Sequence, residues 1–177
     1  KPDMIQVQSP VTATPSQPNG PVEICGLTNN EYSTQEVTGA TSYTWVATPA
    51  SAGTFAGTGL TSTLTASNTW NGAFTVKVAG ANACGNGPYS TELAALLYHQ
   101  PVVYSLYSGG GYCAGNDGYD IKLEDSEVDV DYELFKNSTT TGLIMAGTGE
   151  LLNFGPQPEG EYTVTASNGY CSGNMMG

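Results

Sequence analysis

Short runs in which apolar and polar residues alternate make up most of the chain, and residues that favour turns separate them. One clear run is "SYTWVA" at positions 42–47, where Tyr43, Trp45 and Ala47 are the apolar members. Alternation with a period of two places such side chains on one face of a β-strand. No helix-period run of useful length is present. The pattern therefore predicts an all-β protein built from short antiparallel strands.

The alternating runs form two successive sets, with turn dipeptides such as Asn71-Gly72 and Asn168-Gly169 between them. The first set predicts strands at 22–24, 31–35, 42–47, 60–66, 73–79 and 90–97. The second set predicts strands at 102–107, 119–123, 130–136, 150–154 and 161–167.

The two sets repeat the same sequence features at a nearly constant distance. "FTVKVAGANACGNG" begins at Phe74 and "YTVTASNGYCSGN" begins at Tyr162, which is 88 positions later (162 − 74). "SYTW" and "DYEL" are 89 positions apart (131 − 42), and "AGTG" returns after 90 positions (146 − 56). Several independent matches at one spacing indicate a tandem duplication. We expect two tandem antiparallel β-sandwiches of the immunoglobulin-like (Ig-like) type.

The repeat also predicts how the chain is divided. We expect an N-terminal strand and linker segment at 1–20, with a strand at 4–8 and a Pro/Ser/Thr-rich linker at 9–19. The first Ig-like domain then covers 21–98, and the second covers 99–177. Because the chain starts at Lys-Pro without an initiator Met, we expect a piece of a longer protein.

The second domain is expected to lack its final strand within this chain. Sixteen residues follow Cys84 up to and including Gln100, which is enough for a last strand. Only six residues follow Cys171. An open strand edge is a template for another strand. The expected partners are therefore neighbouring repeats of the same protein, or copies of the chain, bound through that edge.

The four cysteines follow the duplication. Cys113 lies 88 positions after Cys25 (113 − 25), and Cys171 lies 87 positions after Cys84 (171 − 84). Of the three possible pairings, Cys25 with Cys84 and Cys113 with Cys171 is the one that respects the repeat. These spacings do not match a zinc site. Disulfides persist in oxidising compartments, so we expect an extracellular or cell-surface location.

The repeated segments resemble modules of a known type. The residues that carry the resemblance are "EICG", "SYTWV", "AGTG" and "GAFTVKVAGANACG" in the first half, and "YCAGNDGYDIKL", "DYELFKN", "AGTGELLNFGP" and "GEYTVTASNGYCSGNMMG" in the second. They resemble the tandem Ig-like and PKD-like repeats of large secreted or surface proteins of Bacteroidetes, adhesin-type proteins of which many are exported by the type IX secretion system. The resemblance implies spacers in adhesins or filaments, or accessory modules beside catalytic domains.

The charge excludes two classes of partner. The net charge is −12, with four lysines and no arginine. Such a surface repels phosphate backbones and anionic lipid, so we expect no nucleic-acid partner. No apolar stretch reaches the roughly 18 residues of a membrane span, so we expect no membrane insertion.

The acidic run at 117–133 is the candidate cation site. Calcium binds six to eight oxygen ligands, and the expected ligands are Asp117, Asp125, Glu127 and Asp129, with Asn116 beside them. Calcium is the one cofactor that the sequence suggests. The alternative is a solvated strand face, in which the acids at 127, 129, 131 and 133 point outward and the residues at 128, 130 and 132 point inward.

Aromatic residues give a candidate ligand site. Trp45 is expected to fill the first core beneath the disulfide, as the central-strand Trp does in Ig-like sandwiches. Aromatic rings also stack on sugars, and the candidates for such a surface are Trp70, Tyr104, Tyr107, Tyr112 and Tyr119. Core packing and contacts between modules are the alternative explanation.

No catalytic residues are predicted. His99 is the only imidazole and lies at the expected domain boundary, so a nucleophilic triad has no base elsewhere. The sequence favours a non-catalytic spacer of a secreted or surface protein. The alternative is a carbohydrate-binding accessory module of a secreted enzyme.

Overall fold

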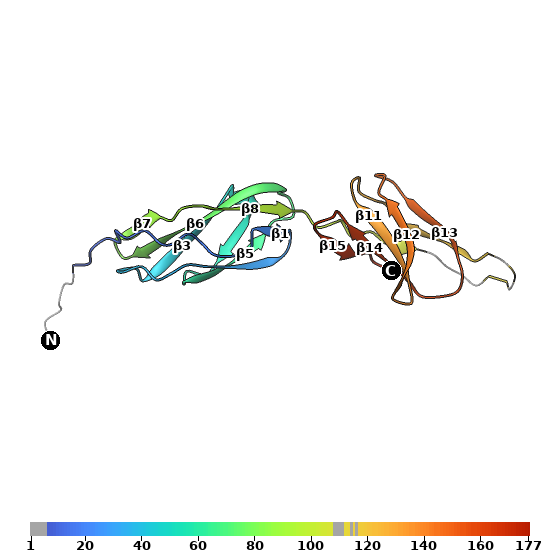
Figure 1. The fold of residues 1–177 in the computed structure, drawn as a ribbon, viewed down its shortest axis with the longest axis horizontal. Coiled ribbons are helices and arrows are strands. Elements are labelled where there is room, and N and C mark those ends of the chain that lie inside the picture. The colour runs from blue at the N-terminus through green and yellow to red at the C-terminus, as the bar shows by residue number, and fades with distance from the viewer. Residues whose placement is uncertain (1–6, 108–111, 114, 116) are drawn as a thin grey trace. The chain divides into compact units, whose positions relative to one another are not determined.

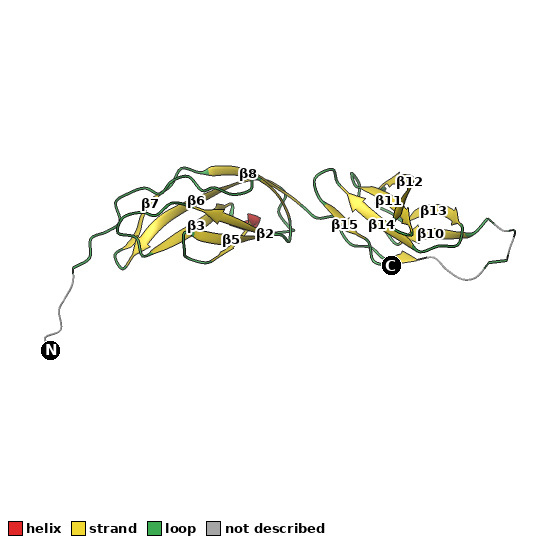
Figure 2. Cartoon of the chain, turned by 60° about the horizontal axis from the view of Figure 1, so that its bottom comes forward, coloured by secondary structure: helices red, strands yellow, loops and turns green. Residues whose placement is uncertain are grey.

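The computed structural model describes residues 7–107, 112–113, 115 and 117–177. The chain divides into two compact units, unit 1 at 1–99 and unit 2 at 100–177. Strands form almost all of the regular structure, and the described helix is a single 3-10 turn, η1 (Ala50–Ala52) (Figures 1 and 2). Within the described residues, no helix has the length and apolar character needed to cross a bilayer. The all-β prediction is confirmed.

Unit 1 is a sandwich of two sheets, as predicted. The smaller sheet has the order β2 (Asn29–Ser33), β5 (Thr61–Ala66), β4 (Gly53–Ala56). The larger sheet has the order β1 (Glu23–Cys25), β8 (Leu93–Tyr98), β6 (Gly72–Asn82), β3 (Ser42–Thr48), with β7 (Gly85–Tyr89) also paired to β6. The two sheets enclose one hydrophobic core.

The alternation in β3 sets which side chains enter the core of unit 1. Tyr43, Trp45 and Ala47 are buried, while the residues between them are half-buried. Trp45 packs against Phe55 of the opposite sheet with ring centroids 5.7 Å apart, and its Nε1 donates a hydrogen bond to the Gly59 carbonyl at 3.1 Å. The predicted place of Trp45 in the core is confirmed.

The segment predicted as a linker is part of unit 1. Val11 is 4% exposed and belongs to its core, and a Cβ on Gly87 would lie 2.6 Å from the Val11 carbonyl oxygen. Asn19 and Ser33 exchange two backbone hydrogen bonds of 2.9 Å each. The linker prediction at 9–19 was wrong. The Pro/Ser/Thr-rich composition is typical of a linker, and one buried valine produces no recognisable sequence pattern. Of the strand predicted at 4–8, residues 4–6 lie outside the described residues, and Val7 and Gln8 are not in a strand.

Unit 2 is a second sandwich with its own core. One sheet has the order β13 (Leu152–Gln157), β10 (Tyr119–Leu123), β9 (Leu106–Tyr107). The other has the order β12 (Thr139–Ala146), β11 (Asp131–Lys136), β14 (Tyr162–Ser167), β15 (Ser172–Asn174). The core of unit 2 is built from residues of both sheets.

A two-residue turn makes unit 2 differ from unit 1. Asn137 and Ser138 have φ values of 49° and 63°, and Lys136 pairs with Thr139 across the turn. Two positive φ angles are typical of the tight hairpin turn that keeps two strands in one sheet. β12 therefore extends the sheet of β11, whereas in unit 1 Pro49 and η1 follow β3, and β4 joins the opposite sheet.

The last part of each sandwich also differs. In unit 1, β7 pairs with the end of β6, and β8 pairs with its beginning, from Gly72 to Val76. In unit 2, β15 pairs with Thr165, Ala166 and Ser167 at the end of β14, which is the counterpart of β7. Among the described residues of unit 2, no strand is the counterpart of β8. The prediction that unit 2 lacks a final strand therefore holds for the counterpart of β8. The short β15 was not predicted.

One tyrosine in each unit closes the loop that precedes its own strand, β3 in unit 1 and β11 in unit 2. The Tyr43 hydroxyl accepts a hydrogen bond from the Val37 N–H at 2.8 Å, and the Tyr132 hydroxyl accepts one from the Glu127 N–H at 2.9 Å. Both tyrosines are buried, and they are 89 positions apart (132 − 43). This shared contact supports the predicted duplication at the level of side chains.

Removing either hydroxyl is expected to destabilise the unit that contains it. Tyr132→Phe leaves the Glu127 N–H without its acceptor, and an unsatisfied buried donor costs about 1–3 kcal/mol. Tyr43→Phe is expected to have an effect of the same size on unit 1. Urea unfolding curves of the two variants test this, and Tyr107→Phe, at a residue that is 46% exposed, is the control. An unchanged midpoint in both variants would contradict the structural role.

Candidate functional site

The cysteines do not form the predicted pairs. Cys25 and Cys171 are disulfide-bonded, whereas Cys84 and Cys113 are free and exposed. Each predicted pair contains one of the free cysteines, so the pairing of Cys25 with Cys84 and of Cys113 with Cys171 was wrong. It follows that Trp45 does not lie beneath a disulfide within unit 1.

In unit 1 the two cysteines lie at opposite ends of the sandwich. Cys25 pairs with Tyr98, next to the point where Leu97 pairs with Gly72, the first residue of β6. Cys84 follows Asn82, the last residue of β6. Ten residue steps along a strand span roughly 33 Å, whereas the Cα atoms of a disulfide lie within about 7 Å.

The same separation holds in unit 2. Cys171 precedes Ser172, which pairs with Ser167 at the end of β14. Cys113 follows Tyr112, whose hydroxyl accepts a hydrogen bond from the Glu159 N–H at 2.9 Å. Glu159 precedes the beginning of β14, and six strand residues cover roughly 17–20 Å. A bond within the unit is therefore out of reach.

The strand order explains the separation of the two cysteines in unit 1. In unit 1, β2 begins where β5 ends, since Asn29 pairs with Thr65, and β6 begins shortly after β5 ends. β2 and β6 therefore start at the same end of the sandwich. Cys25 precedes β2 and Cys84 follows β6, so the two cysteines lie at opposite ends. In immunoglobulin domains, by contrast, the two bonded cysteines lie within the corresponding strands and face each other.

The acidic residues predicted as calcium ligands are bound to nearby backbone groups. Asp125 Oδ1 accepts from the Ser126 N–H at 2.7 Å, and Glu127 Oε2 accepts from the Val102 N–H at 2.6 Å. Asp129 has a φ of 64° and is part of a turn. Val128 is 64% exposed, whereas Val130 and Tyr132 are 1% and 0% exposed. The alternative prediction of a solvated strand face therefore holds from residue 130 onward, into β11, and is wrong for residue 128.

The fourth predicted ligand lies elsewhere in unit 2. Asp117 precedes β10, while the other three acids follow it, and the five residues of β10 separate them by roughly 17 Å. Asn116 lies outside the described residues. Over the part of the chain that the structure describes, no three His, Cys, Asp or Glu side chains are grouped as a metal site requires. Calcium binding stays a prediction without an assembled set of ligands.

The aromatic candidates are divided between the two units, with Trp70 in unit 1 and the four tyrosines in unit 2. Trp70 is half-buried against the core of unit 1, and its buried Nε1 has no hydrogen-bond partner among the described residues. Tyr104 packs against the core of unit 2, where burial and then the carboxylates of Asp125 and Glu127 raise the pKa of its hydroxyl. These two aromatic residues contribute mainly to packing.

The remaining three tyrosines are exposed in unit 2. Tyr107, Tyr112 and Tyr119 have 46%, 36% and 41% of their surface exposed. The rings of Tyr112 and Tyr119 are tilted by 55°, with centroids 6.3 Å apart. The candidate sugar-stacking surface is thereby reduced to this pair and Tyr107. His99 is the last residue of unit 1.

Comparisons with known proteins give one family match and several similar solved structures. Residues 11–95 match the PKD-like domain family. Among solved structures, the chain is similar to the FN1–FN3 domains of chicken CNTN1, with 11% identity, a TM-score of 0.37, and coverage of 96% of this chain and 66% of that one. It is also similar to murine CEACAM1b, with 13% identity, a TM-score of 0.40, and coverage of 91% and 96%.

A bacterial structure is similar to the same degree. The Yersinia pseudotuberculosis adhesin InvE has 14% identity, a TM-score of 0.35, and coverage of 89% of this chain and 57% of that one. No curated protein sequence shows significant similarity to the chain.

Proposed function

We propose that the chain is a non-catalytic structural module, a spacer of a secreted or cell-surface protein of the adhesin-like or filament-forming type. The observation that carries this proposal is the path of the chain through unit 1. Ser9 accepts a hydrogen bond from Asn82 Nδ2 at 2.9 Å, which fixes the incoming chain at one end of the sandwich. The chain leaves after Tyr98, at the opposite end. A unit with its two connections at opposite ends is suited to a linear series.

The proposed location is outside the cell or on its surface. A disulfide-bonded cysteine in each unit fits an oxidising compartment. The match of residues 11–95 to the PKD-like domain family supports the same setting. The finer assignment, to Bacteroidetes and to export by the type IX secretion system, rests on the resemblance of the repeated motifs alone.

The spacer role is tested by stretching a single molecule between its two ends with Cys25 and Cys171 reduced, so that the folded units carry the force instead of a disulfide. Since each unit has its own core, we expect two separate unfolding events. In a panel of polysaccharides, we expect no binding. A single unfolding event at very low force would contradict the role of a load-bearing spacer.

The alternative is a carbohydrate-binding accessory module, and the exposed Tyr112–Tyr119 pair is the observation in its favour. It predicts binding to a polysaccharide that Tyr112→Ala abolishes. The matched control is Tyr89→Ala, at a tyrosine of unit 1 that is 39% exposed. Binding that only the first variant loses would replace the spacer role with this one.

A further inference from the structure

The two free cysteines stand at the repeat-equivalent positions of the two bonded ones. Cys84 of unit 1 corresponds to Cys171 of unit 2, and Cys113 of unit 2 corresponds to Cys25 of unit 1. Cys25 and Cys171 are disulfide-bonded, while Cys84 and Cys113 are exposed thiols. Each position of the repeat therefore occurs once in the bonded state and once in the free state.

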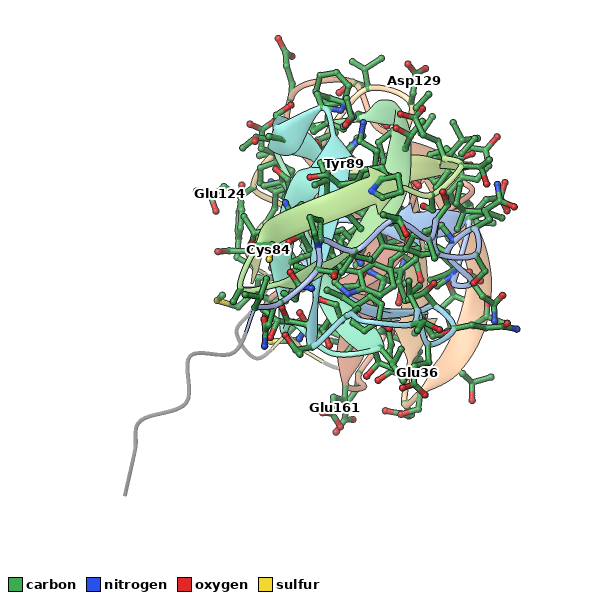
Figure 3. All side chains as sticks on the ribbon, turned by 90° about the vertical axis from the view of Figure 1, so that its left-hand side faces the viewer. Glu36, Cys84, Tyr89, Glu124, Asp129 and Glu161 are labelled. Atoms are coloured by element: carbon green, nitrogen blue, oxygen red, sulfur yellow. The ribbon has the colours of Figure 1, made fainter. Side chains whose placement is uncertain are left out.

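Each unit presents its second cysteine at the end where the chain comes in, which we call the proximal end. In unit 1, Cys84 Sγ donates a hydrogen bond to the Gln8 carbonyl at 3.3 Å, so this thiol lies beside the incoming chain. Figure 3 labels Cys84 and shows its sulfur at the surface. Cys25 lies at the opposite, distal end, where the Gly26 N–H donates to the Tyr98 carbonyl at 2.7 Å.

Unit 2 has the same arrangement. Its incoming chain is held by the hydrogen bond from the Val102 N–H to Glu127, just ahead of β11, whose first residue pairs with Ser167. Cys171 lies at this proximal end because the adjacent Ser172 also pairs with Ser167. Cys113 lies at the distal end, next to Tyr112 and the beginning of β14.

We propose that Cys84 and Cys113 are cross-linking sites that join repeats of this type head to tail. The proximal Cys84 bonds to the distal cysteine of a preceding repeat, and the distal Cys113 bonds to the proximal cysteine of a following one. The partner is another repeat with the same two cysteines, of which a second copy of this chain is the available example. Since Cys84 and Cys113 lie on different surfaces, the contact is heterologous and generates open chains rather than closed dimers.

The bond forms by thiol–disulfide exchange. A thiolate attacks a small-molecule or protein disulfide, and the resulting mixed disulfide is attacked by the thiolate of the second repeat. One new S–S bond forms, the two thiols lose two protons and two electrons, and the disulfide that was attacked first is reduced to two thiols. Exposure of both sulfurs gives the oxidant access.

The identity of the partner, another repeat, rests on the proposed role of the chain in a series of repeats. The two proposals fail separately. Two unfolding events in the stretching experiment without any cross-link would leave the spacer role in place and remove the cross-linking sites. Cross-linked chains that bind a polysaccharide through Tyr112 would leave the cross-linking sites in place and remove the spacer role.

The test uses the full chain and two single variants, Cys84→Ser and Cys113→Ser, incubated with a mixture of reduced and oxidised glutathione. Both positions are exposed, and circular dichroism of each variant verifies the fold. On non-reducing gels the unmodified chain is expected to give a reducible ladder of dimers, trimers and longer chains. Each variant alone is expected to remain monomeric, and an equimolar mixture of the two is expected to give dimers only.

Peptide mapping identifies the bond. The proposal requires a peptide pair that joins Cys84 to Cys113 in the dimers formed by the mixture. It is overturned if the unmodified chain stays monomeric with both thiols glutathionylated. It is also overturned if each variant alone forms dimers as readily as the mixture does, because symmetric bonds would then be equally favourable.

Discussion

Trp45→Ala is expected to lower the free energy of unfolding of unit 1 by about 3–5 kcal/mol, the usual cost of truncating a buried Trp to Ala. Trp45 is 8% exposed and contacts Phe55 of the opposite sheet. The substitution also removes the indole N–H that binds the Gly59 carbonyl. The loss of packing and of this hydrogen bond both act within unit 1.

The matched control is Leu134→Ala in unit 2. Leu134 is 0% exposed and occupies the position 89 residues after Trp45 (134 − 45). Its truncation is expected to cost about 2–5 kcal/mol, and this cost falls on unit 2. Calorimetry combined with hydrogen exchange assigns each loss to one unit. Equal destabilisation of both units by either variant would contradict two separate cores.

Gly147→Ala is the second substitution with a large expected effect. A Cβ at Gly147 would lie 1.8 Å from the carbonyl oxygen of Glu127, far inside van der Waals contact. The backbone cannot easily move away, because the Gly147 N–H donates to the Val130 carbonyl at 2.7 Å. Inserting a methyl group into packed surroundings typically costs 1–3 kcal/mol, and more where backbone must shift. We expect a loss of about 3 kcal/mol in unit 2.

Gly173→Ala is the control for this substitution. Gly173 lies in β15, and an added Cβ there would have no heavy atom within 4 Å. The free energy of unfolding is expected to change by less than about 0.5 kcal/mol. Urea unfolding of both variants measures the difference. Equal effects at the two glycines would show that the close approach of Gly147 to Glu127 does not exist in solution.

Alternation alone was sufficient to place most strands of both sandwiches. It succeeded where one strand face is buried, as in β3, whose buried residues match the pattern. It failed for β12, whose first four residues are all exposed and therefore show no period of two. The turn at Asn137-Ser138 that defines this strand depends on two positive φ angles, and the sequence pair lacks the glycine that usually signals such a turn.

The cysteines show what spacing cannot supply. The intervals of 59 positions from Cys25 to Cys84 (84 − 25) and of 58 from Cys113 to Cys171 (171 − 113) agree with the repeat, but they contain no information about which end of the sandwich each residue occupies. The end that each cysteine occupies depends on the direction of β2 relative to β6, since Cys25 precedes β2 and Cys84 follows β6. Reading the predicted strand directions together with the cysteine positions would have excluded bonds within each half.

The acidic run shows a related limit of sequence patterns. Glu127 accepts the backbone N–H of Val102, and Asp125 accepts that of Ser126. Carboxylates that bind local backbone groups resemble a cation site in sequence, because both arrangements concentrate acids near a turn. What distinguishes the two arrangements here is that Asp117 lies before β10 and the other three acids lie after it.

The most direct measurement is the mapping of thiols and disulfides in the monomeric chain, by alkylation before and after reduction. The structure predicts that Cys84 and Cys113 are alkylated without reduction, and that Cys25 and Cys171 are alkylated only after it. Recovery of Cys25 joined to Cys84, or of Cys113 joined to Cys171, would show that the cysteines of a unit meet. That result would contradict their placement at opposite ends of each sandwich.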